Sequence, residues 1–374
     1  MTELREFPNV PLDQILEGNC IDILESLPAD SIDLIFADPP YNLQLHQDLW
    51  RPNLTRVDPV DDDWDRFDDF QAYDRFTLQW LAACRRVLKR SGTIWVIGSY
   101  HNIYRVGSRI QDLGFWILND IVWIKDNPMP NFRGVRFTNA HEILLWAQKE
   151  RGASYTFNHH AMKSLNEDLQ MRSDWYLPIC SGAERLRENG EKAHATQKPE
   201  ALLYRVILAS TNPGDVVLDP FFGTGTTGVV AKRLHRRWIG IEREAEYIRL
   251  ASQRILEAKP TSNKLDLFQT TSRRKQPRIP FGMLLEHNLL QPGQALTLGS
   301  NPQIVAHVRA DGALDYDGQH GSIHQIARQI CQAPCNGWEQ WYYLDPQTDT
   351  RQSIDHLRER LRHNLSNNNG EHDP

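Results

Sequence analysis

The chain has 374 residues and a formal net charge of −6, and 40% of its residues are hydrophobic and 24% charged. These ordinary globular values exclude a chain that is mostly disordered, collagen-like or coiled-coil, and the length fits one large domain with a smaller module. No apolar run approaches the roughly 18 to 20 residues of a membrane helix. The first ten residues lack the basic-then-apolar layout of a signal peptide, so we expect a cytoplasmic protein without a membrane partner.

Short β-rich runs alternate with helical patterns through the first 260 residues. The expected strands are 32–37, 93–98, 120–124, 143–147, 216–218 and 238–241. The expected helices are 71–88, ended by Ser91 and Gly92, and 199–208. Several strands are apolar on both faces, as in a parallel sheet with helices on each side. The pattern predicts a doubly wound α/β fold.

The later part of the chain suggests the domain organisation. Residues 150–192 are polar and lack periodicity, which predicts an insertion in a first domain rather than a core layer. The expected division is a first domain at 1–265, a basic linker at 266–279, a small α+β domain at 280–360 and a disordered tail at 361–374. In the second domain a short strand run is expected at 303–308. An aromatic cluster follows, which we assign to the core, with stacking on unpaired bases as the alternative; it comprises Trp338, Trp341, Tyr342 and Tyr343.

Charge and cysteine content bear on partners and metals. The negative net charge argues weakly against a nucleic-acid partner, but it sums eight acids and one Arg at 58–74 with thirteen Lys or Arg and five acids at 232–278. We interpret the acidic stretch as a solvated loop that leads into a helix. Five cysteines are too few and too scattered for a disulfide framework. Only Cys331 and Cys335 lie close together, and no second Cys or His pair has zinc-ligand spacing, so no metal is expected.

A glycine-rich turn follows the expected strand at 216–218. Gly223, Gly225 and Gly228 satisfy the pattern GxGxxG between a strand and a helix, a context that favours a nucleotide-containing cofactor. Glycine lets the backbone turn tightly and lets a ligand approach it. Glu242, at the end of the next strand, is placed to accept hydrogen bonds from ribose hydroxyls. The motif therefore predicts an adenosine-containing cofactor.

The residue before the glycines distinguishes two cofactor classes. Asp219 would repel the pyrophosphate of a dinucleotide but attract the α-ammonium group of S-adenosyl-L-methionine. This favours a methyl donor, and an NAD-dependent dehydrogenase remains the more remote alternative.

A second motif, Asp38-Pro39-Pro40-Tyr41, follows the expected strand at 32–37. The two prolines fix the backbone and remove two N–H donors. The Asp38 carboxylate and the Pro39 carbonyl would accept the two hydrogens of an exocyclic amine, which directs the nitrogen lone pair at a methyl sulfonium. Tyr41 offers a face on which a flipped base can stack. These residues predict methyl transfer to an amino group.

The two motifs together resemble those of the amino-group DNA methyltransferases. DPPY followed by DPFFGTG is similar to the order of their permuted β class. The stretches 127–142 and 196–208, with GSIH and CNGW in the second domain, resemble the cell-cycle-regulated adenine methyltransferases of alphaproteobacteria. This resemblance covers nearly the whole chain. It implies a Rossmann-like methyltransferase sheet and methylation of the adenine amino group at GANTC sites in double-stranded DNA.

The resemblance also implies roles for single residues. Asp38, Pro39, Pro40 and Tyr41 would form the catalytic loop. The cofactor-binding set would be Asp22, Thr196, Gln197, Lys198, Asp219, Phe221, Gly223, Gly225 and Glu242. Lys198 would pair with the cofactor carboxylate. Asp22 would lie near the cofactor adenine, or alternatively serve as a helix N-terminal charge.

DNA contacts are expected in two places. Asn131, Arg133 and Arg136 lie in a Pro-flanked loop suited to groove and phosphate contact, with a purely structural loop as the alternative. The insertion would form the target-recognition region, without a role assigned to any single residue; it contains His159, His160, Lys163, Arg172, Trp175 and Arg185. The family further implies a homodimer that works at the nucleoid. Two alternatives are a cytosine-N4 methyltransferase, which Asp38 opposes because Ser is usual there in the cytosine enzymes, and a non-catalytic DNA-binding module.

Overall fold

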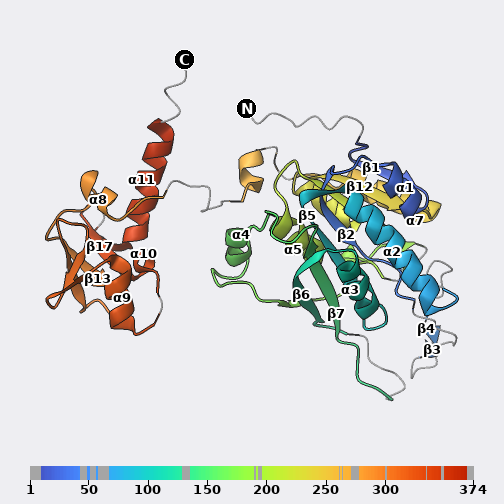
Figure 1. Cartoon of the computed structure of the whole chain (residues 1–374), viewed down its shortest axis with the longest axis horizontal. Coiled ribbons are helices and arrows are strands. Elements are labelled where there is room, and N and C mark those ends of the chain that lie inside the picture. The colour runs from blue at the N-terminus through green and yellow to red at the C-terminus, as the bar shows by residue number, and fades with distance from the viewer. Residues whose placement is uncertain are drawn as a thin grey trace. The chain divides into compact units, whose positions relative to one another are not determined.

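The computed structural model of the chain describes residues 10–42, 49–50, 56–57, 67–128, 135–188, 191–192, 196–260, 262, 264–270, 278–299, 301–333, 335–346 and 349–368. The chain forms two compact units, Met1–Ser272 and Arg273–Pro374 (Figure 1). Among the described residues, no helix is both long and apolar enough to cross a membrane.

The first unit is built on an eight-stranded sheet. Its strands are β1 (Gln14–Glu17), β2 (Ile32–Ala37), β5 (Leu88–Gly98), β6 (Trp116–Lys125), β7 (His141–Gln148), β8 (Asp174–Leu177), β11 (Val216–Asp219) and β12 (Arg237–Glu242). Their order across the sheet is β1-β12-β11-β2-β5-β7-β6-β8. Neighbouring strands are parallel except at β7, which runs antiparallel to β5 and to β6. The doubly wound α/β prediction is confirmed.

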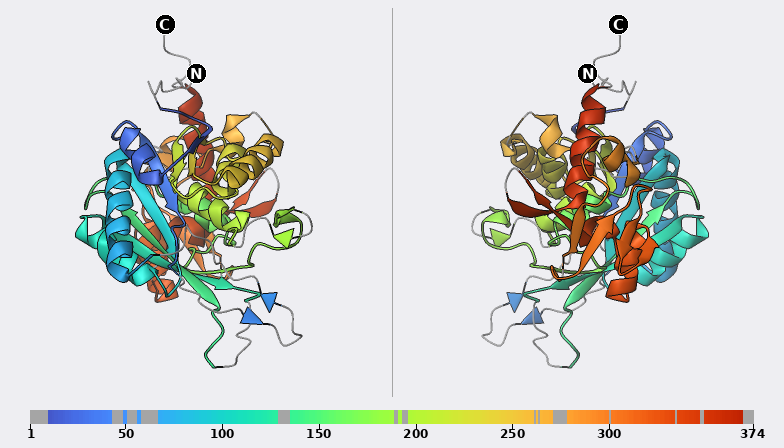
Figure 2. Two further views of the ribbon diagram at one scale, coloured as in Figure 1. Left: turned by 90° about the vertical axis from the view of Figure 1, so that its right-hand side faces the viewer. Right: turned by 90° about the vertical axis from the view of Figure 1, so that its left-hand side faces the viewer.

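Helices cover both faces of this sheet (Figure 2). The helices of the unit are α1 (Cys20–Ser26), α2 (Phe70–Val87), α3 (Ile103–Asp112), α4 (His159–Ser164), α5 (Glu200–Ser210), α6 (Thr226–Arg233) and α7 (Ala245–Glu257). Leu34 and Phe36 of β2 pack in the core cluster that contains α5, α6 and α7. Ile35 and Ala37 pack with α1, α2 and α3. Because consecutive side chains of a strand point to opposite faces, a strand covered on both faces must be apolar throughout.

The remaining elements of this unit are short. They are the strand pairs β3 (Leu49–Trp50) with β4 (Arg56–Val57) and β9 (Arg187–Glu188) with β10 (Glu191–Lys192), and the 3-10 turns η2 (Gly182–Glu184) and η3 (Leu265–Phe268). The Phe268 ring packs against His235 with a centroid separation of 4.3 Å. The first residues of the expected linker at 266–279 therefore pack on the first unit.

The expected stop of the first long helix at Ser91 and Gly92 is wrong. The helix α2 ends at Val87, and β5 begins at the next residue, Leu88. Ser91 and Gly92 lie within β5, where its register against β2 shifts. A Cβ at Gly92 would lie 2.7 Å from the Leu88 side chain and 3.0 Å from the Ile32 carbonyl oxygen. The glycine therefore serves a close approach of two strands.

The interpretation of residues 150–192 as lying outside the core layers is wrong for part of that stretch. The strand β8 pairs in parallel with β6 and forms the edge of the main sheet. Trp175 and Leu177 are buried in the core, and the Trp175 ring lies 5.9 Å from that of Trp95. Trp175 is therefore a core residue. A four-residue strand is too short for its alternation to stand out in a polar stretch.

The second unit contains a six-stranded antiparallel sheet. Its strands are β13 (Ala295–Leu298), β14 (Val305–Val308), β15 (Leu314–Tyr316), β16 (Gln319–Gly321), β17 (Trp341–Asp345) and β18 (Thr350–Ser353), in the order β16-β15-β14-β13-β17-β18. Its helices are α8 (Gly282–Glu286), α9 (Ile323–Cys331), α10 (Gly337–Gln340) and α11 (Ile354–Asn368). Trp338, Trp341 and Tyr343 are buried, which confirms the core assignment for three of the four aromatic residues.

The expected disordered tail at 361–374 is wrong for its first half. The helix α11 continues through Asn368, and Leu361 and Arg362 are buried. Ile354, Leu357 and Leu361 recur at helical spacing and pack in the core of the second unit. Because this apolar stripe is narrow and the rest of the helix is charged or polar, the composition of the segment did not indicate a helix. Residues 369–374 lie outside the described residues.

Candidate active site

A cavity of about 330 Å³ lies at the edge of the sheet where β1, β2, β11 and β12 end. The carboxyl ends of parallel strands in such a sheet form the usual ligand site. The predicted residues that line the cavity are Asp38, Pro40, Thr196, Gln197, Lys198, Asp219, Phe221, Gly223 and Glu242. The structure thus brings both sequence motifs and the 196–198 segment to one cavity.

Four predicted residues, Asp22, Pro39, Tyr41 and Gly225, do not line this cavity. Asp22 is exposed in the first turn of α1, the position of the alternative reading as a helix N-terminal charge. Gly225 precedes α6 with a φ of 77°, and a Cβ there would lie 2.9 Å from the Cβ of Ala251 in α7. Gly225 therefore allows α6 and α7 to pack closely.

Glu242 is held in place by backbone donors. Its Oε2 accepts the N–H of Gly223 at 2.7 Å, and its Oε1 accepts those of Arg243 and Glu244 at 2.8 and 3.0 Å. The carboxylate at the end of β12 is therefore fixed to the glycine-rich turn that follows β11. This places a strong acceptor on the cavity wall beside the turn.

Asp219 is almost fully buried at the end of β11. Burial raises the pKa of its carboxyl group to about 7, although hydrogen bonds from Thr227 Oγ1 at 2.6 Å and from the Phe221 N–H at 3.0 Å oppose this shift. None of the interactions that act on Asp219 among the described residues comes from a cation. A buried carboxylate in such surroundings favours a cationic ligand, because the ligand's charge would stabilise the ionised form. The Asp219 environment therefore fits the positively charged end of an amino-acid moiety.

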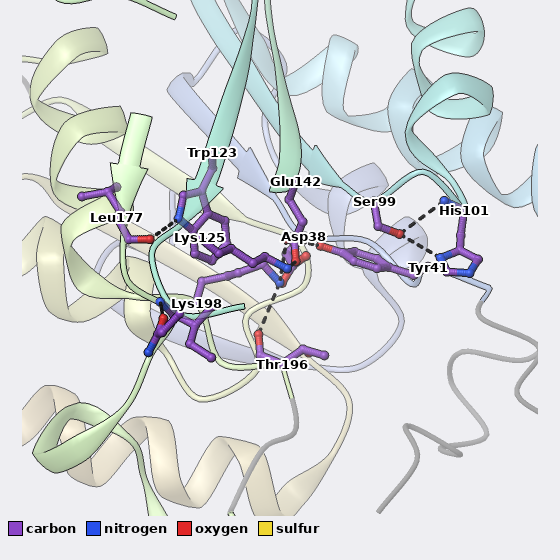
Figure 3. A network of polar contacts seen from close by, with 12 residues as sticks. Asp38, Tyr41, Ser99, His101, Trp123, Lys125, Glu142, Leu177, Thr196 and Lys198 are labelled. Carbon is purple, nitrogen blue, oxygen red and sulfur yellow. Dashed lines mark hydrogen bonds and ion pairs between the residues drawn. The ribbon is translucent and has the colours of Figure 1, made fainter. Parts of the chain in front are cut away.

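The predicted catalytic loop follows β2, and its residue Asp38 forms a largely buried ion pair. The Nζ atom of Lys198 lies 2.6 Å from Oδ2 of Asp38 (Figure 3). Among the described residues, no hydrogen bond reaches the buried Oδ1 atom of Asp38. Burial raises the pKa of Asp38, and the charge of Lys198 opposes this increase. Lys198 was expected at the cofactor carboxylate, but here it binds Asp38.

The backbone of the loop is fixed from α2 and α3. The buried Tyr73 hydroxyl donates to the Pro40 carbonyl oxygen at 2.8 Å. The side-chain amide of Asn102, also buried, donates to the Tyr73 hydroxyl at 3.3 Å and to the same carbonyl at 3.5 Å. Sequence reasoning missed both residues, since each is a single polar residue in a helical pattern, without a motif around it.

A second carboxylate, that of Glu142, lies behind the loop. Its Oε2 accepts the Tyr41 hydroxyl at 3.0 Å, and its Oε1 accepts Lys125 Nζ at 2.7 Å (Figure 3). Tyr41 is therefore held by its hydroxyl, and Lys198 Nζ lies 5.2 Å from its ring centroid. Sequence reasoning missed Glu142 and Lys125. They meet because Glu142 is the second residue of β7 and Lys125 is the last residue of the antiparallel strand β6, an orientation that the sequence pattern did not specify.

The expected DNA contacts are only partly within the described residues. Asn131 and Arg133 lie outside them. Arg136 is exposed and donates from Nη1 to the Tyr100 hydroxyl at 2.6 Å, beside Phe137, which is 98% exposed. Of the residues named in the insertion, His159, His160 and Lys163 belong to α4, Arg172 pairs with Asp174, and Arg185 follows η2.

The sequence of the chain is similar to known protein families and to two known methyltransferases. Residues 32–253 match the family described as DNA methylase, and residues 261–367 match the family described as Restriction Enzyme Adenine Methylase Associated. The chain is 49% identical over 341 residues to the type II methyltransferase M.HinfI of Haemophilus influenzae, covering 91% of this chain and 94% of that one. It is 42% identical over 250 residues to the type II methyltransferase M2.DpnII of Streptococcus pneumoniae, covering 67% and 91%.

A solved structure shows the same fold. The cytosine-N4-specific PvuII DNA methyltransferase matches with a TM-score of 0.51 and 22% identity, over 68% of this chain and 90% of that one. The M1.HpyAVI complex with S-adenosylmethionine matches at 30% identity with a TM-score of 0.48, over 65% and 98%. The family match spans more than half of the chain, and the relatives match it closely over most of their own length. The chain therefore belongs to the N6/N4 DNA methylase family and is a DNA methyltransferase that uses S-adenosyl-L-methionine as methyl donor.

Proposed function

We propose that the chain methylates the N6 amino group of adenine in double-stranded DNA. The observation that carries this proposal is the Asp38 carboxylate at the rim of the cofactor cavity. One of its oxygens already binds an ammonium group at 2.6 Å, and no described residue donates a hydrogen bond to the other, buried oxygen. Asp38 therefore provides acceptors suited to an exocyclic amine.

The chemistry follows from this placement. An ionised Asp38 accepts a hydrogen of the amino group, which raises electron density on the nitrogen and orients its lone pair. The donor supplies an electrophilic methyl group on its sulfonium, so that a nitrogen–carbon bond forms as the carbon–sulfur bond breaks with its electrons remaining on sulfur. The nitrogen then gives up one proton, and Asp38 is placed to accept it.

The cavity residues support binding of the donor. Asp219 offers a buried carboxylate to the donor's α-ammonium, and Glu242 offers an acceptor to its ribose hydroxyls. Phe221 also lines the cavity, with its ring edge-on to Trp80 at 5.3 Å, and provides an apolar wall. Thr196, Gln197 and Lys198 close the cavity from the segment before α5. Gln197 is itself bonded to the backbone of Glu184 and Leu186, which anchors this segment.

Two observations favour adenine over cytosine as the target. Asp38 stands where the cytosine-N4 members of the resembled class usually carry Ser. Residues 261–367 also match a family whose description names adenine methylases. The target sequence proposed is GANTC, which the resemblance to the β-class, cell-cycle-regulated methyltransferases implies. A cell-cycle role at the nucleoid is part of the same proposal.

For the second unit we propose a role in DNA contact or in a homodimer. Its support is the basic segment around residues 273–278 and the match to a methylase-associated family. Removal of everything after Ser272 should weaken duplex binding and spare binding of the methyl donor. If the protein without the second unit binds duplex DNA equally well and keeps the same number of subunits in solution, this role is discarded.

The deciding experiment methylates unmodified DNA with the purified protein and the labelled donor. Digestion to nucleosides should yield N6-methyl-2′-deoxyadenosine, and sequencing of the product should place the methylated adenine at GANTC. N4-methylcytosine would instead support the alternative target base, and methylation at another sequence would overturn GANTC alone.

A further inference from the structure

Lys198 occupies a hydrogen-bonding position on Asp38 that a substrate amino group would need. Its Nζ atom lies 2.6 Å from Asp38 Oδ2, the distance and chemistry that the hydrogen of an exocyclic amino group requires. The ammonium therefore occupies, at this oxygen, the position of a substrate amine. The other oxygen, Oδ1, is buried, so a target amine that binds Oδ2 must displace Lys198.

Displacement of Lys198 requires another anion nearby. The Lys198 side chain is only 8% exposed, and an ammonium that loses its partner in a buried site carries a large desolvation cost. Oε2 of Glu142 lies 4.0 Å from Nζ of Lys198, and the Glu142 side chain is 11% exposed (Figure 3). A small rotation of the lysine side chain would convert this separation into a direct ion pair.

Glu142 is itself held ready as an anion. Burial alone would raise the pKa of Glu142, but Lys198 and Lys125 bring it below its ordinary value. Lys125 binds Oε1 at 2.7 Å, so it fixes the carboxylate while leaving Oε2 directed toward Tyr41 and Lys198. Two carboxylates and two ammonium groups thus balance each other in this buried cluster.

We propose that Glu142 is a positioning residue that receives Lys198 when the target base occupies Asp38. This inference rests on the proposed function, because it assumes that an amino group binds Asp38. Lys198 then has two positions: on Asp38 in the free enzyme, and on Glu142 during methyl transfer. The exchange keeps the lysine charge paired throughout and leaves Asp38 ionised and open to the amine.

The first test is Glu142→Gln, which keeps the size and a hydrogen-bond acceptor but removes the charge. Lys198 then has no anion to move to and continues to compete for Asp38. We expect kcat for methyl transfer to fall by about tenfold or more. The dissociation constant of S-adenosyl-L-methionine, measured by calorimetry, should change little, because Glu142 does not line the cofactor cavity.

The pH dependence of kcat/KM distinguishes a positioning role of Glu142 from a purely structural one. The charged or titratable groups that act on Asp38, Glu142 or Lys198 are Tyr41, Lys125, Arg185 and Asp219. Besides burial, the Glu142 charge raises the pKa of Asp38. Its removal should lower that pKa and move the acid limb of kcat/KM to lower pH. Glu142→Asp keeps the charge and should return the limb toward the wild-type position.

A double-mutant cycle with Lys198→Met tests whether Glu142 acts through the lysine. Single-turnover rates are measured so that slow variants remain quantifiable. In the Lys198→Met background, Glu142→Gln should lower the single-turnover rate much less than it does in the wild type, because Glu142 then has no lysine to pair with. An equal cost in both backgrounds, or an acid limb that Glu142→Gln does not move, would overturn the proposal.

A matched control is the buried pair of Asp33 and Lys89, at 2.7 Å with exposures of 15% and 17%. Asp33→Asn should lower stability but leave the acid limb of kcat/KM in place. This control distinguishes the loss of an ion pair elsewhere in the fold from the loss of the Glu142 charge. The outcome is also distinguishable from failure of the proposed function. If the product is N4-methylcytosine, the target base is wrong, yet the cycle applies unchanged because cytosine presents the same amino group.

Discussion

Lys198 and Asp38 lie 160 residues apart in the sequence, and their side chains meet at 2.6 Å at the edge of the cofactor cavity. This pair joins the segment before α5 to the loop after β2. It also links Asp38 to the wall of the cavity, because Lys198 and Asp219 line the same cavity. Truncation of one partner would leave a buried charge unpaired, which is costly.

Asp38→Asn should abolish methyl transfer while preserving donor binding. The amide lacks the negative charge that draws the hydrogen of the amine and accepts the proton, so we expect the single-turnover rate to fall by about 100-fold or more. Incorporation of labelled methyl into DNA gives the rate, and calorimetry gives the donor affinity. Asp112→Asn, which changes an exposed acid paired with Arg109, is the control. A rate within about twofold of wild type would refute the role of Asp38.

Asp219→Asn should stabilise the free protein at pH 8. Burial raises the pKa of Asp219 in the folded state to about 7, above its ordinary value of 3.8. The folded state therefore binds the proton more tightly than the unfolded state, and wild-type stability falls as pH rises from about 4 to 7. The penalty can reach on the order of 4 kcal/mol above that window. Denaturant unfolding at pH 4 and pH 8 checks this, since the variant's advantage should appear only at the higher pH.

Donor affinity should increase with pH in the wild type. Only ionised Asp219 attracts the α-ammonium group, and the raised pKa leaves a large neutral fraction below pH 7. The dissociation constant of S-adenosyl-L-methionine should fall several-fold between pH 6 and pH 8, with proton release on binding. The same titration with Asp219→Asn should be nearly flat, and a parallel slope in the two proteins would contradict the assignment.

Gly240→Ala should destabilise the first unit. A Cβ at this position of β12 would lie 2.4 Å from the Phe222 ring, which stacks on Trp238 with a centroid separation of 5.5 Å. Because a packed ring cannot yield easily, we expect a loss of about 1 to 3 kcal/mol in the free energy of unfolding. Gly282→Ala is the control, since its Cβ would meet nothing within 4 Å. Equal unfolding curves for the two variants would contradict this packing argument.

The sequence by itself determined the fold class and most of the cofactor cavity. Apolar runs at β2, β5 and β11 have no polar face, so they indicate a sheet covered on both sides. In such a sheet the residues just after the strands gather at one edge. Asp38, Asp219 and Glu242 therefore belong together whatever the details of packing. The sequence was sufficient to group these three residues because each directly follows or ends a strand, and the ends of parallel strands lie at one edge of the sheet.

Only the tertiary structure decided which charges surround Asp38. Glu142 reaches Tyr41 and Lys198, and Lys125 reaches Glu142, because β7 runs antiparallel to its neighbours, and periodicity carries no information on strand direction. The structure likewise placed Trp175 in the core and Gly225 against α7. Each depends on contacts between segments far apart in sequence. A polar residue at a strand end can be read from the chain, but its partner is fixed only when the sheet is assembled.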